Sequence, residues 1–160
     1  MHRIALAAAA LPTALLFGAT AWADPITPQS DTPCAPDLSG VMTWPQNDAL
    51  PLVCADAPGG RQWQRVTTPQ PPNDRWLSTG PAVTLHGEGQ RNPNVESGNW
   101  TATPQDPAGR CRAEQRVVVS PGVLGTPTVS ESAPGQPLSF QVPPRLFTIV
   151  LSGNCLWAHG

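Results

Sequence analysis

The chain has 160 residues, which is enough for one ordinary domain. Its 9 basic and 11 acidic residues leave a net charge of −2, and it contains no lysine and no tyrosine. Its 21 prolines lie well above the average usage of about 5%. This composition excludes a coiled coil, a helical bundle and a nucleic-acid binder with a basic face, and no stretch after residue 23 is apolar enough to span a membrane.

The first 23 residues have the three parts of a secretory signal peptide. A basic start that includes Arg3 precedes the mostly apolar residues 4–16, and Ala21 and Ala23 are small residues two positions apart. We therefore expect cleavage after Ala23 and a secreted or cell-envelope location for the remaining chain.

Four cysteines follow, and their spacing favours disulfides over a metal site. Metal sites usually take ligands from close pairs, whereas no two cysteines here are closer than 20 positions. An even number of cysteines in an exported chain predicts two disulfides. Sequential pairing, Cys34 with Cys54 and Cys111 with Cys155, closes the shortest loops and is our prediction. We expect no metal and no cofactor.

The N-terminal part of the exported chain predicts a small lobe. Residues 37–44 have a capping Asp and apolar side chains at helical spacing, so a short helix is expected there. Residues 52–55 and 61–67 flank a Pro-Gly-Gly turn and predict a β-hairpin. The predicted segments are a flexible proline-rich arm (24–33), a disulfide lobe (34–67), a proline-rich connector (68–75) and an antiparallel β domain (76–160).

The larger domain has a two-residue periodicity. Residues 111–119 and 138–142 alternate between apolar and polar side chains, as half-buried strands do. Residues 146–151 are apolar on both faces and predict the central strand, and 82–85 and 99–103 predict two more. Short strands with Gly and Pro between them indicate a mostly β fold, an antiparallel β-sandwich or small barrel.

Sequence patterns for catalysis are missing. The chain contains no nucleophile elbow and no phosphate-binding loop, and its cysteines are expected to be oxidised. His86, two positions before Glu88, is the best acid–base candidate, although an exposed pair at a loop is the simpler interpretation. We predict no catalytic residue.

Tryptophans beside polar residues are the best candidates for ligand binding. Arg75 and Trp76, and Asn99 and Trp100, lie at predicted loop–strand junctions. Such groups can stack on a sugar ring and bind its hydroxyls, or the tryptophans can be core residues with a stacked arginine. The candidate ligand-binding residues are Arg75, Trp76, His86 and Trp100.

Several short stretches resemble one group of proteins. They are Asp-Arg-Trp-Leu at 74–77, Leu-His-Gly-Glu-Gly at 85–89, Gly-Asn-Trp-Thr-Ala-Thr-Pro at 98–104 and Ser-Gly-Asn-Cys-Leu-Trp at 152–157. Together they resemble small exported proteins of unknown function from mycobacteria and related actinobacteria. The resemblance implies export and supplies no catalytic residue.

These patterns favour a non-enzymatic, disulfide-stabilised binding module. Its expected partner is an envelope glycan or another secreted protein, and no nucleic acid. Two alternatives stay open: a secreted hydrolase that uses His86 with a carboxylate, and an inhibitor of a secreted enzyme that presents the loop 68–74.

Overall fold

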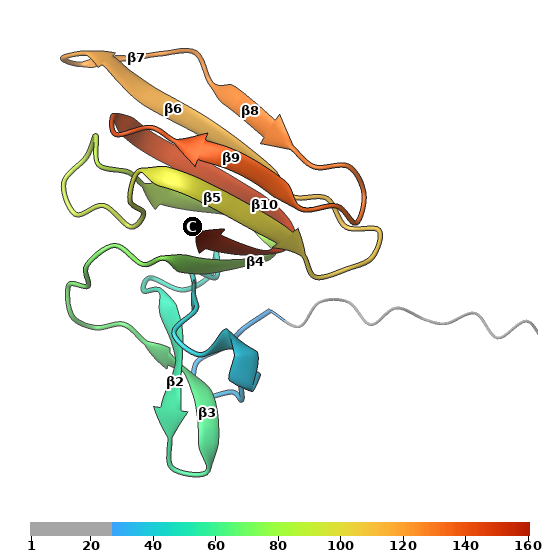
Figure 1. Ribbon diagram of the computed structural model, residues 1–160. Helices are drawn as coiled ribbons and strands as arrows, with labels where there is room; N and C mark the ends of the chain where they lie inside the picture. Colours follow the sequence, from blue (N-terminus) through green and yellow to red (C-terminus); the bar gives the residue numbers. More distant parts are fainter. Residues whose placement is uncertain (1–26) are drawn as a thin grey trace, which may run out of the picture.

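The structure of the protein is a computed structural model, and it describes residues 27–160. The predicted signal peptide and its cleavage site lie outside the described residues. Figure 1 shows a larger β domain with a smaller lobe beneath it. After a 3-10 turn, η1 (Pro36–Leu38), the strands are β1 (Met42–Thr43), β2 (Leu52–Ala57), β3 (Gly60–Arg65), β4 (Arg75–His86), β5 (Gly98–Pro104), β6 (Arg112–Ser120), β7 (Val123–Leu124), β8 (Thr128–Glu131), β9 (Leu138–Val142) and β10 (Leu146–His159).

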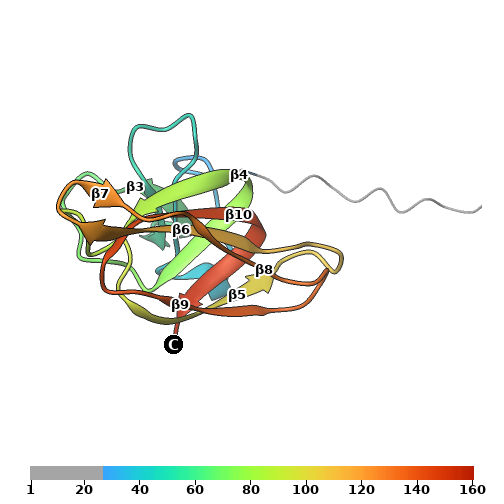
Figure 2. The same cartoon turned by 90° about the horizontal axis from the view of Figure 1, so that it is seen from above.

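The long strand β10 organises the sheet. One of its edges pairs with β4, while the other pairs with β6 in its first half and with β5 in its second half. β6 also pairs with β7 and β8, and β5 also pairs with β9. The sheet therefore has two branches that start at β10, β6–β7–β8 and β5–β9, and both fold over the core (Figures 1 and 2). Every described ladder is antiparallel except one parallel pairing of Met42 with Trp76. The prediction of a mostly antiparallel β fold with β10 at its centre is confirmed.

Alternation along the strands supplies two apolar clusters on opposite faces of β4 and β10. Trp76 and Trp157 point into the main core, whereas their neighbours Leu77 and Leu156 point to the smaller cluster. The smaller cluster also contains Val41, Leu52, Cys54 and Trp63 from the N-terminal lobe. The lobe therefore packs against the face of β4 and β10 that points away from the main core.

The helix predicted for residues 37–44 is wrong. The helical part is only the turn η1, and Gly40 has a positive φ of 76° that interrupts it. Val41 and Met42 then lie in different clusters, Val41 in the small one and Met42 in the main core. Their apolar side chains thus follow the alternation of an extended segment that leads into β1, and not a helical face.

The predicted arm is ordered in part. The backbone N–H of Asp31 donates to the Trp63 carbonyl at 2.7 Å, and that of Cys34 donates to the Arg61 carbonyl at 3.1 Å. These bonds attach residues 31–34 to the outer edge of β3. Proline removes donors locally, but a strand edge accepts any extended segment that still offers alternate N–H groups.

Both disulfides have the predicted sequential pairing. Cys34 pairs with Cys54 in the small lobe, with 6.0 Å between their Cα atoms. Cys111, which precedes β6, pairs with Cys155 in β10, with 5.9 Å between their Cα atoms. Two disulfides and no free cysteine among the described residues indicate an oxidising environment.

The hydroxyl of Ser78 is the hydrogen-bond partner of the most buried tryptophan. Trp157 donates its indole N–H to Ser78 Oγ at 2.8 Å, and Ser78 Oγ donates to the Gly153 carbonyl at 2.6 Å. Ser78→Ala leaves that buried N–H without a partner, so we expect a loss of about 1–3 kcal/mol in the free energy of unfolding. Urea unfolding followed by fluorescence measures it, with the exposed Ser139→Ala as control. Equal midpoints for the two variants would contradict this role.

Candidate functional site

Arg75 and Trp76 are both occupied by contacts within the protein. Arg75 donates to the backbone carbonyls of Asp37 at 2.9 Å and Ser39 at 3.1 Å, so it holds η1 against the start of β4. Trp76 is only 1% exposed, and its indole N–H donates to the Asn73 carbonyl. Trp76 therefore offers no open face for a sugar, and two N–H groups of the Arg75 guanidinium are already used within the protein.

Trp100 is likewise a core residue. It is 2% exposed, packs against His159 with 5.3 Å between the ring centroids, and donates its indole N–H to the Glu96 carbonyl. Trp76 and Trp100 both occupy inward positions of their strands, which is the physical reason for their burial. The prediction that these two indoles stack on a ligand at the surface is therefore not supported.

His86 lies at the exposed end of β4. Its backbone N–H donates to Asn94 Oδ1 at 2.8 Å. Within residues 27–160 no carboxylate lies at ion-pair distance from its ring. The described residues therefore do not bring together the His–carboxylate pair that the hydrolase hypothesis requires.

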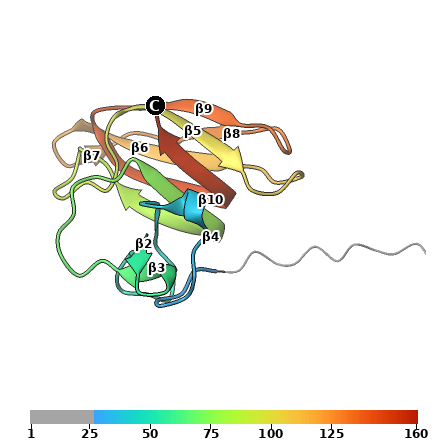
Figure 3. The same cartoon turned by 60° about the horizontal axis from the view of Figure 1, so that its bottom comes forward.

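A groove opens instead between the small lobe and the main domain. It has a volume of about 380 Å³. Figure 3 shows the connector after β3 and the loop between β4 and β5 on the same side of the molecule. We call it the Trp44 groove, and its lining is Met42, Trp44, Leu50, Pro51, Val66, Thr67, Thr68, Pro69, Gln70, Pro71, Trp76, Asn92, Pro93 and Asn94. None of these side chains carries a charge.

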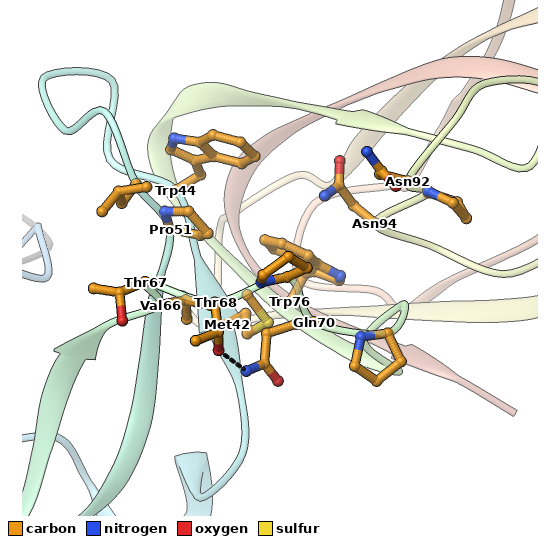
Figure 4. Close-up of a pocket in the computed structure, with 14 residues that line it drawn as sticks. Met42, Trp44, Pro51, Val66, Thr67, Thr68, Gln70, Trp76, Asn92 and Asn94 are labelled. Atoms are coloured by element: carbon orange, nitrogen blue, oxygen red, sulfur yellow. Dashed lines mark hydrogen bonds between the residues drawn. The ribbon is translucent and has the colours of Figure 1, made fainter.

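The walls of the Trp44 groove combine one accessible indole with amide groups. In Figure 4 the Trp44 ring lies across from the side chains of Asn92 and Asn94, with Trp76 below. Trp44 is half-buried, and its indole N–H donates to the Asp48 carbonyl at 3.2 Å, which fixes the ring and leaves its face as the contact surface. Such a surface can bind apolar groups, while the amides can both donate and accept hydrogen bonds.

Three separate segments build this groove. Trp44 directly follows β1, whose Met42 is buried in the main core. Thr67 at the end of the lobe and residues Thr68 to Pro71 of the connector form a second wall, where prolines limit backbone freedom. The loop with Asn92 and Asn94 is fixed by backbone bonds of Asn94, which donates to the His86 carbonyl at 2.8 Å and accepts from the Asn73 N–H at 2.9 Å.

The sequence interpretation missed Trp44, Asn92 and Asn94 as site residues. Of the predicted candidates only Trp76 reaches the Trp44 groove, as its buried base. One available signal was the run Asn-Pro-Asn at 92–94, a composition typical of turns. The loop 68–74, which the inhibitor alternative would present to an enzyme, contributes a wall of the groove.

Two further features are absent from residues 27–160. This part of the chain holds no cluster of three or more His, Cys, Asp or Glu side chains that could ligate a metal. It also contains no helix long and apolar enough to cross a membrane. No protein-family model matches the sequence, and neither a curated protein nor a solved structure matches it.

Proposed function

We propose that the protein is an exported, non-enzymatic binding module that takes an uncharged saccharide in the Trp44 groove. The observation that carries the proposal is the lining, which joins an indole face to side-chain amides without any charged group. A signal peptide cleaved after Ala23 and a place outside the cell or in its envelope belong to the same proposal. The resemblance to exported actinobacterial proteins supports them.

The chemistry of the groove selects against charged ligands. A charge placed against Trp44, the prolines and Val66 would lose hydration without gaining a counter-ion. A pyranose ring suits the groove better, because its apolar face can cover the indole and its hydroxyls can bind amides. The volume of about 380 Å³ is near the lower end of small-molecule sites, so it suits one or two sugar units of a longer chain.

Trp44→Ala tests this proposal. Removing the stacking face is expected to raise the Kd for the bound polysaccharide roughly ten- to thirtyfold. Calorimetry and intrinsic fluorescence against neutral glucans, mannans and galactans measure the effect. Trp44→Phe should retain part of the affinity, because it keeps an aromatic face.

Two asparagines provide a matched control. Asn92→Ala removes an amide from the Trp44 groove, whereas Asn47→Ala removes an exposed amide outside it. We expect only the first variant to weaken binding. If no neutral polysaccharide binds the oxidised protein, or if Trp44→Ala binds as tightly as the unaltered protein, the saccharide proposal is wrong.

A further inference from the structure

A second groove lies between the two branches of the sheet, beside the turn that joins β9 to β10. It consists of two hollows of about 410 and 450 Å³ that share Val117, Pro143 and Pro144. Gln115, Thr128 and Gln141 line one end, and Val118, Val119 and Arg145 line the other. We call it the β6–β9 groove. Its middle is apolar, one end carries amides and the other carries a guanidinium.

Diverging strands leave this groove open. β8 pairs only with β6, and β9 pairs only with β5, so each is an edge strand of its branch. Figure 2 shows β8 and β9 running apart from the loop that connects them. β9 carries no charged residue and no proline within its bounds, features with which proteins commonly protect an edge. The open edge is thus suited to pairing with another extended segment.

Gln115 presents an unpaired carbonyl at this place. Its side chain is buried, with the residue only 6% exposed. Nε2 donates to the Gln141 carbonyl at 3.2 Å, whereas Oε1 is buried and has no hydrogen-bond partner among the described residues. A buried carbonyl without a donor destabilises the free protein, and a ligand N–H that reached it would remove that penalty.

The backbone of β9 offers further partners. The Gln141 carbonyl accepts from Gln115, so it points away from β5 and toward the groove. In agreement, its register partner Asn99 uses its carbonyl for the Gly160 N–H on the other side. In an antiparallel ladder the N–H and C=O of one residue point the same way, so the Gln141 N–H also faces the groove. An extended peptide can therefore add to this edge.

The charge of Arg145 indicates which group one end of the ligand carries. Arg145 is exposed and takes part in none of the ion pairs formed within residues 27–160. No acidic side chain lines either hollow. The adjoining Val119 is 50% exposed and thus open to contact with a ligand. A peptide that covers the valines and carries a carboxylate next to Arg145 matches both features.

We propose that the β6–β9 groove docks an extended, largely apolar segment of a partner protein that carries one acidic side chain. The peptide backbone pairs with the free edge of β9 and donates an N–H to Gln115 Oε1. Its apolar side chains cover Val117 and the Pro143–Pro144 turn, and its acidic side chain lies against Arg145. This site is independent of the Trp44 groove and of the saccharide proposal.

The test uses a phage-displayed library of random hexapeptides selected on the oxidised protein. We expect enrichment of peptides with alternating apolar residues and one Asp or Glu. A synthetic copy of an enriched peptide should shift the side-chain amide NMR signal of Gln115. Gln115→Leu should weaken this peptide about three- to tenfold through loss of one hydrogen bond. Arg145→Gln should weaken it about two- to fivefold, with the larger effect at low salt.

Controls separate docking from folding. Arg91→Gln removes another exposed arginine away from the groove and should leave the affinity unchanged. Gln115→Leu removes the unpaired carbonyl as well as a hydrogen bond, so its unfolding midpoint should stay close to that of the unaltered protein. The proposal is overturned if no acidic, apolar pattern is enriched, if Arg145→Gln binds as tightly as Arg91→Gln, or if the groove is instead covered by a second copy in a concentration-dependent dimer.

Discussion

Replacing Cys111 and Cys155 together by alanine is expected to lower the free energy of unfolding by about 4 kcal/mol, because the bridge closes a separation of 44 residues. Total domain stability is typically about 5–15 kcal/mol, so this loss is a large fraction of it. Both half-cystines are fully buried in the main core, where they fasten the start of β6 to β10. Urea unfolding of the oxidised protein, followed by tryptophan fluorescence and far-UV circular dichroism, measures the change.

The other disulfide provides the comparison. Cys34 and Cys54 are 20 positions apart, so the same chain-entropy estimate gives about 3 kcal/mol for their removal. That bridge belongs to the small cluster around Trp63, and Cys34 is only half-buried. We expect the Cys34/Cys54 double variant to keep a folded main sheet. If the main sheet unfolded in this variant and stayed folded in the Cys111/Cys155 variant, our view of which disulfide stabilises the main sheet would be wrong.

Gly153→Ala is expected to cost about 3–5 kcal/mol, from the sum of backbone strain and steric overlap. Gly153 has a φ of 94°, in the region that favours glycine, and it lies at the bulge where the pairing of β10 with β4 shifts register. A Cβ there would overlap the carbonyl oxygen of Arg110 and would lie 3.2 Å from the Cys155 sulfur. The substitution therefore strains the strand and its disulfide together.

The matching substitution at Gly80 separates the effect of backbone strain from that of steric overlap. Gly80 is the register partner of Gly153 on β4 and has a similar φ of 106°, yet a Cβ built there meets nothing within 4 Å. Gly80→Ala should cost only about 1–2 kcal/mol from backbone strain. Thermal and urea unfolding of both variants give the comparison. If both variants lost the same free energy of unfolding, the Arg110 carbonyl would have to move away from the new methyl group, and steric overlap would contribute nothing.

Most of the fold prediction was based on the two-residue periodicity of strands. Residues 111–119 and 138–142 alternate in sequence, and β6 and β9 alternate in burial over the part of each strand that faces the core. The apolar run at 146–151 correctly indicated a strand paired on both edges. β4 is longer than residues 82–85, because Gly80 and Pro81 look like a turn in sequence but form part of the bulged strand.

The site residues were harder to predict, because burial and long-range assembly leave no local pattern. Trp76 and Trp44 are both tryptophans beside polar residues, yet only the alternation of β4 decides that Trp76 faces the core. The Trp44 groove joins segments about 50 residues apart, between Met42 and Asn94. The unpaired Oε1 of Gln115 lies where β6 meets β9, two strands that are distant in the sequence and do not pair, so no local pattern indicates it.

The position of β10 determines when the sheet can form. β4, β5 and β6 precede it in the chain, and none of the described ladders joins these three strands to one another directly. Each of them can pair earlier only with its other neighbours, β4 with β1, β5 with β9, and β6 with β7 and β8. The three parts of the main sheet therefore join only when residues 146–159 are available. Contacts between such distant segments make folding slow compared with that of local hairpins. Assembly of the main sheet is thus a late step that depends on β10.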